Sequence, residues 1–142
     1  MSDIDTLRRV LRDSHTIAVV GLSAESDRPS FMVARYLQEH CFRIVPVNPK
    51  YSNILGETCY PDLLTIPFPV DMVDVFRKSQ DCLPIAQDAI TIGAHTLWLQ
   101  IGVVNEEARA IAEQAGLTVV MNRCTKIDHA QLVGDGFTGS CA

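Results

Sequence analysis

The chain has 142 residues, of which 47% are hydrophobic and 20% are charged, and its formal net charge is −5 at pH 7. This composition excludes wholesale disorder, and the length predicts one domain over residues 1–142, with an N-terminal helix within 1–15 and a flexible tail at 134–142. The negative charge argues against general nucleic-acid binding, and the sequence has neither an apolar run long enough for a membrane span nor a signal-peptide core.

The first elements alternate in the manner of an α/β fold. Apolar residues recur at helical spacing over residues 3–13, which predicts an amphipathic helix. The β-branched run 16–21 follows and ends in glycine, as expected for a strand buried on both faces. Residues 30–40 then read as a helix, for which Ser30 and Asp27 are candidate N-caps.

The same alternation continues along the chain. The remaining predicted elements are strands at 43–49, 70–76, 96–102 and 117–122, and helices at 82–92 and 105–115. Between the second and third strands, three prolines leave room only for a short helix near 62–65. Five short apolar strands separated by helices predict a Rossmann-like, doubly wound, mainly parallel sheet in the order 3-2-1-4-5, with an additional N-terminal helix.

The end of the first strand is the first candidate for a ligand site. In open α/β sheets, ligands bind beyond the carboxyl ends of the strands where the strand order reverses, which in the predicted order lies between the first and fourth strands. Gly21 lets the backbone approach a ligand, Ser23 supplies a hydroxyl for a phosphate, and the helix starting near Ser30 offers free N–H groups. A plain connecting turn is the alternative, because the G-x-G-x-x-G pattern is absent.

The second and third strands are followed by basic residues. Asn48 and Pro49 precede Lys50 at a position where an NAD site usually carries a carboxylate for the ribose hydroxyls. A lysine there disfavours NAD and suits a phosphate on the ribose, as in CoA or NADP; a solvated surface lysine is the alternative. Arg77 and Lys78 are further candidate phosphate partners, although exposed pairs of this kind are commonly only solubilising.

The fourth strand is followed by a helix start that does not suit an anion. Gly102 allows close passage of a ligand, and Asn105 is a good N-cap. Glu106 and Glu107 occupy the first helical turn, where they complement the helix dipole and would repel a phosphate. The anion site is therefore assigned to the helix after the first strand.

The sequence offers no catalytic constellation and no metal site. The four histidines are not at metal-ligand spacing, and no nucleophile elbow of the G-x-S-x-G type occurs. Cys124 lies between Arg123 and Lys126, whose charges would favour a reactive thiolate; a passive, half-buried thiol is the alternative. The five cysteines are scattered without a C-x-x-C pair, a pattern typical of reduced thiols in the cytosol. We therefore expect a cytoplasmic protein.

Together these segments resemble a known family. As an ordered set they resemble the small single-domain CoA-binding proteins of bacteria, which are similar to the N-terminal CoA-binding domain of the succinyl-CoA synthetase α subunit. The segments that carry the likeness are TIAVVGLSAESDRPSFMVARYL, VPVNPK, VDMVDVFRKS, TLWLQIGVVNEEA and GLTVVMNRC, and the likeness extends over about residues 5–133.

The resemblance implies a site for CoA or acyl-CoA. The residues that it implies are Gly21, Leu22, Ser23, Arg28, Pro29 and Ser30 for the CoA phosphates, Asn48, Pro49 and Lys50 for the nucleotide portion, Val75, Phe76 and Arg77 for the adenosine or pyrophosphate, and Gln100, Ile101 and Gly102 for the pantetheine arm. In the same loop, we expect Glu25 to face solvent and Asp27 to cap the helix or pair with Arg28.

The sequence also departs from the family pattern. The family has R-C-P after the fifth strand, whereas Thr125 follows Cys124 here, and the missing proline is expected to loosen this segment. The synthetase also uses a second domain with a phosphorylated histidine, and nothing in this sequence matches that domain, so its activity is not carried over.

The expected function is binding of CoA or acyl-CoA without catalytic machinery, as a carrier, sensor or accessory module. The alternative is an NADP-dependent oxidoreductase, or a subunit of an acyl-CoA enzyme that is completed by a partner chain. The expected partner is a CoA-type small molecule, with no nucleic acid, membrane or metal, and a protein partner or homodimer is left open.

Overall fold

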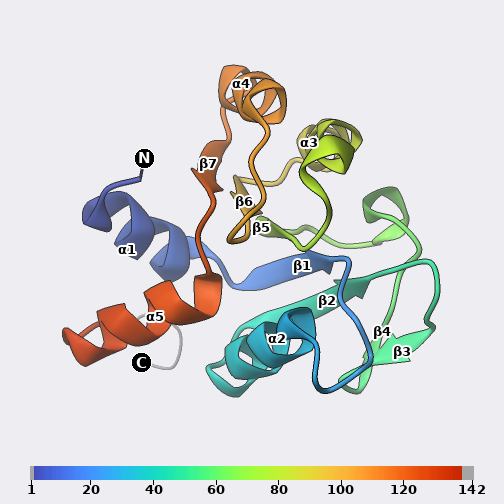
Figure 1. Ribbon diagram of the computed structural model, residues 1–142, viewed down its shortest axis with the longest axis horizontal. Coiled ribbons are helices and arrows are strands. Elements are labelled where there is room, and N and C mark those ends of the chain that lie inside the picture. Colours follow the sequence, from blue (N-terminus) through green and yellow to red (C-terminus); the bar gives the residue numbers. More distant parts are fainter. Residues whose placement is uncertain (1, 139–142) are drawn as a thin grey trace.

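The computed structural model describes residues 2–138, and its central element is a sheet of five parallel strands (Figure 1). The strands are β1 (Thr16–Val20), β2 (Arg43–Val47), β5 (Met72–Val75), β6 (Thr96–Leu99) and β7 (Thr118–Met121). Nearly all of their side chains are buried, because helices cover both faces of a parallel sheet. Each predicted strand is present, but each ends earlier than predicted, because its last residues turn into the connecting loops.

The strands lie in the order β2-β1-β5-β6-β7. The α/β fold with a mainly parallel, doubly wound sheet is therefore confirmed, whereas the predicted order 3-2-1-4-5 is wrong. The third of the five strands, β5, pairs with β1 on the side opposite β2, so β2 is an edge strand. Pro46 gives a physical reason, since a proline has no N–H to donate and suits an edge. Its carbonyl accepts from the Tyr60 N–H, 3.0 Å away, on the outer side of the sheet.

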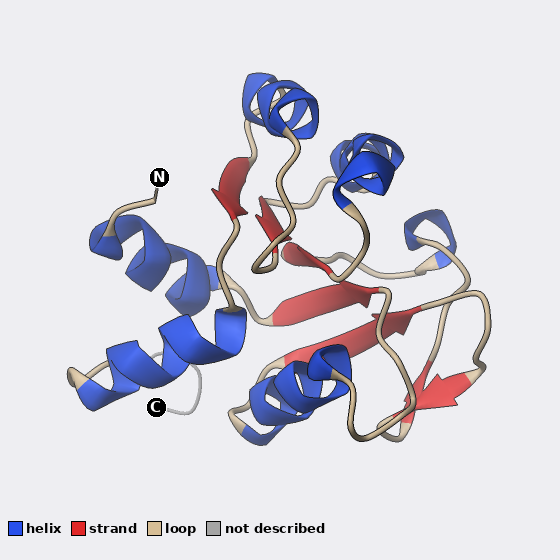
Figure 2. Ribbon diagram, in the orientation of Figure 1, coloured by secondary structure: helices blue, strands red, loops and turns tan. Residues whose placement is uncertain are grey.

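The helices divide between the two faces (Figure 2). Helices α1 (Ile4–Asp13), α2 (Pro29–Glu39) and α5 (Thr125–Gly134) pack on one face, and their buried residues form one core cluster with Trp98. Helices α3 (Cys82–Thr91) and α4 (Glu106–Gln114) pack on the other face through small residues, mainly alanines. None of the described helices is long and apolar enough to cross a membrane.

One predicted helix cap agrees with the structure and one does not. Asn105 caps α4 by accepting a hydrogen bond from the Ala108 N–H, as predicted. The N-cap of α2 is Arg28, which makes no capping hydrogen bond, so the predicted caps Ser30 and Asp27 are both wrong. Pro29 at the first helical position explains this start, because its fixed φ and missing N–H suit the first turn.

The connection between β2 and β5 holds a short hairpin, β3 (Asn53–Ile54) and β4 (Glu57–Thr58), which the sequence did not suggest. The predicted short helix is the 3-10 turn η1 (Leu63–Thr65), and a second such turn, η2 (Ser79–Asp81), precedes α3. Thus the segment before β5 is ordered although it lacks a long helix.

Helix α5 was not predicted from the sequence. It contains the first residue of the expected flexible tail, Gly134, and Phe137 just beyond it packs against the same core cluster as α5. The Phe137 N–H donates to the Leu132 carbonyl at 2.9 Å. Residues 139–142 of the expected tail lie outside the described residues.

Candidate functional site

The site begins where the chain leaves β1. Because β2 and β5 flank β1, the strand order reverses between β1 and β5, and not between the first and fourth of the five strands as predicted. Gly21 lies at this point with φ +86°, and its N–H donates to the Val47 carbonyl at 2.9 Å. A Cβ here would overlap the Phe76 carbonyl oxygen and lie 2.9 Å from Arg77 Cδ. Close packing of the loops after β1 and β5 therefore requires glycine at position 21, independently of any ligand.

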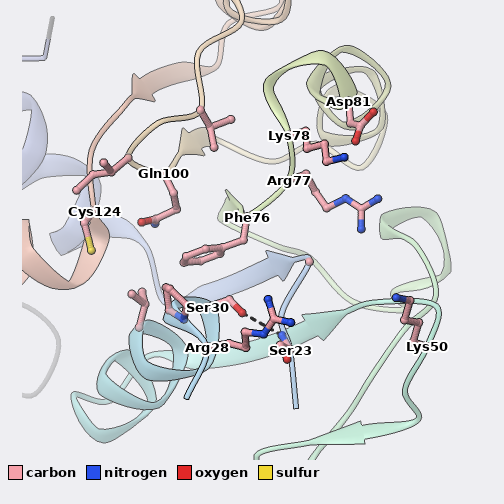
Figure 3. Close-up of a pocket in the computed structure, with 15 residues that line it drawn as sticks. Ser23, Arg28, Ser30, Lys50, Phe76, Arg77, Lys78, Asp81, Gln100 and Cys124 are labelled. Carbon is pink, nitrogen blue, oxygen red and sulfur yellow. Dashed lines mark hydrogen bonds between the residues drawn. The ribbon is translucent and has the colours of Figure 1, made fainter. Parts of the chain in front are cut away.

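A cavity of about 870 Å³ opens beside Gly21, over the ends of β1, β5 and β6. This volume is within the range of about 300–1,000 Å³ that is usual for small-molecule sites. Figure 3 shows that its two ends differ in character, with Phe76 between them. Lys50, Arg77 and Lys78 lie toward one end, and Gln100 and Cys124 lie toward the other.

The loop after β1 is held by its own side chains. The Ser30 hydroxyl accepts the Ser23 N–H at 3.0 Å, and the Ser23 hydroxyl accepts the Glu25 N–H at 3.1 Å. Asn48 connects this loop to the next one: its amide donates to the Leu22 carbonyl at 3.1 Å and accepts from the Lys50 N–H at 2.9 Å. These bonds fix the loops that carry Ser23 and Lys50 relative to each other.

The carboxylates of this loop stay outside the cavity lining. Arg28 pairs with Glu25 at 2.9 Å, so the predicted pairing of Arg28 with Asp27 is wrong. Both side chains of the pair are more than half exposed, and a solvent-exposed pair contributes about 1 kcal/mol or less. Breaking the pair of Arg28 and Glu25 would therefore cost a ligand phosphate little free energy.

The end of the cavity with Gln100 and Cys124 is supported by a buried network of hydrogen-bonded polar side chains. Asp74 of β5 is fully buried, and it accepts hydrogen bonds from the amide of Gln100 and, at 3.0 Å, from the hydroxyl of Thr125. Burial raises the pKa of the Asp74 carboxyl to about 7, and the two hydrogen bonds oppose this rise. Thr125 is fully buried in this network, which argues against the loosening expected from the absent proline.

The loop that carries Cys124 is also well anchored. The Trp98 indole N–H donates to the Arg123 carbonyl at 2.8 Å, and Arg123 pairs with the largely buried Asp128 at 2.7 Å. This pair raises the pKa of the Arg123 guanidinium. Cys124 itself is a half-buried free thiol on the cavity wall. Among residues 2–138, no group of three His, Cys, Asp or Glu side chains is placed to hold a metal ion.

Comparison with known proteins identifies the family. A family model described as a CoA binding domain matches residues 15–130. The chain belongs to the CoA binding domain family. The matched range includes all five strands of the parallel sheet and every residue that lines the cavity.

Relatives of this CoA binding domain protein include both single-domain proteins and part of a ligase. The uncharacterized protein YneT of Bacillus subtilis (strain 168) is 40% identical over 124 residues, which is 87% of this chain and 92% of that protein. Acetate–CoA ligase [ADP-forming] I of Archaeoglobus fulgidus is 38% identical over 119 residues, which is 76% of this chain but only 17% of the ligase. The similarity therefore extends over one region of the ligase and not over the whole ligase.

Among solved structures, a hypothetical protein from Pyrococcus horikoshii OT3 superimposes with a TM-score of 0.91. It is 38% identical and 94% of each chain is covered. The resemblance to succinyl-CoA synthetase-like CoA-binding domains that the sequence suggested is confirmed at the level of the family.

The cavity of this CoA binding domain brings together ten of the residues that the sequence singled out. They are Gly21, Ser23, Arg28, Pro29, Ser30, Lys50, Phe76, Arg77, Gln100 and Ile101. The other five do not line it: Leu22 and Val75 are core residues, Asn48 links loops, Pro49 lines a neighbouring cavity, and Gly102 is not among the lining residues.

Five lining residues were not among those assigned from the sequence. They are Val33, Lys78, Asp81, Val103 and Cys124. Lys78 stood out in the sequence as a candidate phosphate partner, and Cys124 stood out by its basic neighbours. Val33 lies on the buried face of α2. Asp81 gave no signal, because its position depends on the turn η2.

Proposed function

We propose that this protein binds CoA or acyl-CoA across the cavity and acts as a carrier, sensor or accessory module without chemistry of its own. The observation that carries the proposal is the difference between the two ends of the cavity (Figure 3). CoA is itself two-ended, with a phosphorylated nucleotide at one end and an uncharged pantetheine arm at the other. The phosphates fit the end with Lys50, Arg77 and Lys78, and the arm fits the end with Gln100 and Cys124.

The electrostatics support this orientation. No carboxylate of the β1 loop lines the cavity, and the basic side chains at one end come from the separate loops after β2 and β5. Basic side chains at this end favour the phosphates there, because charge-assisted hydrogen bonds to phosphate are stronger than hydrogen bonds between neutral groups. Asp81 at the same end adds an acceptor for a hydroxyl or amino group of the nucleoside.

A titration of the full chain with CoA, acetyl-CoA, NADP and NADH tests the proposal. A ligand at a hundredfold excess over its Kd adds about 2.7 kcal/mol to the stability of the folded state. We expect CoA and acetyl-CoA to raise the unfolding midpoint by several degrees and NADH to leave it unchanged. A rise with NADP alone would favour the oxidoreductase alternative and overturn the CoA assignment.

Lys50 is expected to bind the ribose phosphate of CoA. We predict that Lys50→Ala weakens CoA binding by about tenfold, in keeping with loss of a charge-assisted hydrogen bond, and changes dephospho-CoA binding less than twofold. Isothermal titration calorimetry measures both affinities. Lys126→Ala is the matched control, because Lys126 does not line the cavity. Equal losses for CoA and dephospho-CoA would show that Lys50 does not contact the ribose phosphate.

A further inference from the structure

The amide of Gln100 has a defined orientation in the cavity wall. Gln100 is only 4% exposed, and its Nε2 group donates to both Asp74 Oδ1 and Thr125 Oγ1, the latter at 3.0 Å. The Thr125 hydroxyl in turn donates to Asp74 Oδ2 at 3.0 Å. Both amide hydrogens of Gln100 therefore have partners, and so does the hydroxyl hydrogen of Thr125.

Asp74 is what fixes this orientation. An ionised carboxylate only accepts hydrogen bonds, so it requires the Nε2 side of the Gln100 amide to face it. Turning the amide over would set Oε1 against the carboxylate and leave a buried repulsion between two acceptors. The carbonyl oxygen Oε1 is consequently the atom that Gln100 has available for the cavity, and no other residue among 2–138 donates a hydrogen bond to it.

A buried acceptor without a partner selects ligands that carry a donor. Leaving such an atom unpaired is costly, so a ligand that supplies an N–H gains affinity relative to one that does not. Gln100 lies at the same end of the cavity as Cys124, away from the basic residues (Figure 3). The donor must therefore come from the uncharged part of the ligand.

We propose that Gln100 Oε1 accepts a hydrogen bond from an amide N–H of the pantetheine arm, and that Asp74 and Thr125 are positioning residues that hold the Gln100 amide for it. This inference rests on the proposed binding of CoA. It makes Gln100 the residue that recognises the arm, while the basic residues recognise the phosphates. The arm carries an amide with or without an acyl group on the sulfur, so CoA and acyl-CoA are recognised alike.

The test compares ligands that differ in the arm. Gln100→Met keeps the length of the side chain and removes the acceptor. At pH 8.5, calorimetry should show CoA and acetyl-CoA binding weakened about tenfold, the loss of one hydrogen bond, and adenosine 3′,5′-bisphosphate, which lacks the arm, changed less than twofold. Equal weakening of all three, or no weakening of any, overturns the role of Gln100. Weakening of CoA without acetyl-CoA shows that the thiol is the donor and also overturns it.

Asp74→Asn tests the positioning role with an isosteric side chain. The asparagine amide can donate to Gln100 Oε1, so the Gln100 amide is expected to turn and present Nε2 to the arm. CoA and acetyl-CoA binding should then weaken about tenfold while bisphosphate binding is retained. Unchanged CoA affinity overturns the role of Asp74. A wild-type protein that binds no CoA overturns the proposed function itself, which keeps the two failures distinguishable.

Discussion

Replacing Gly21 with alanine is expected to lower the free energy of unfolding by about 3 kcal/mol, the sum of backbone strain and overpacking. Gly21 has φ +86°, a conformation that a residue with a Cβ adopts only at a cost. The added Cβ would also overlap the Phe76 carbonyl oxygen, so the backbone at the end of β5 must move. Urea denaturation followed by circular dichroism measures the change.

Gly102→Ala separates the two contributions. Gly102 has nearly the same φ, +85°, but nothing lies within 4 Å of an added Cβ. This variant should lose only about 1 kcal/mol, from backbone strain alone. The difference between the variants then reports the contact with Phe76. If both lose the same free energy, close packing of the two loops is not what Gly21 provides.

Gly21 also shows which structural features a local sequence pattern can predict and which it cannot. A glycine at the end of a buried strand indicated that the backbone turns there and that something passes close by. The sequence offered a ligand as the close neighbour, whereas the structure also places the Phe76 carbonyl against Gly21. That contact depends on β5 lying beside β1, which local spacing does not reveal.

The order of the strands illustrates the same limit. Each strand was predictable, because a run of apolar residues between helices must be buried on both faces. Which edge of β1 the third strand joins depends on pairing between distant segments. One clue was nevertheless present: Pro46 suits an edge strand, and the predicted order would have enclosed its strand on both sides. In the observed sheet, the strand order reverses between β1 and β5. The expected ligand site therefore lies between β1 and β5, and not between the first and fourth strands as predicted.

The polar network under the cavity was not foreseen, although one of its members was conspicuous. Asp74 interrupts an apolar strand that must be covered on both faces, and a buried carboxylate needs hydrogen-bond donors. The donors, Gln100 and Thr125, follow two other strands of the sheet. Only the assembled sheet, with α5 packed against it, brings the three side chains together. Residues that reach the cavity directly from a strand end were easier to predict.

The second large effect concerns the pH dependence of stability. Asp74 has its pKa raised from 3.8 to about 7 in the folded protein, chiefly by burial. Between these values the folded state holds a proton that the unfolded state has released, so the stabilisation present below pH 4 is lost as the pH rises to about 7. Each pH unit in this interval corresponds to about 1.4 kcal/mol. Relative to Asp74→Asn, the wild-type protein should thus lose about 3 kcal/mol between pH 5 and pH 8.

Urea denaturation of both proteins at pH 5, 6, 7 and 8 measures this difference. The comparison removes the contributions of other groups, such as His129, whose pKa is lowered by burial and which acts in the opposite direction in both proteins. The side chains that hydrogen-bond to Asp74 are the uncharged Gln100 and Thr125, so no ionic partner offsets its charge there. A difference between the two proteins that is constant over this pH range would contradict the assignment.

The same titration connects stability to binding. The ionised Asp74 carboxyl holds the Gln100 amide with Oε1 toward the cavity, whereas a protonated carboxyl can donate to Oε1 and release this constraint. The affinity for CoA relative to adenosine 3′,5′-bisphosphate should therefore increase as the pH rises through about 7 in the wild-type protein. In Asp74→Asn the ratio should stay at its low value throughout. The buried negative charge of Asp74 thus lowers the stability of the folded protein, and the same charge orients Gln100 Oε1 for the pantetheine arm.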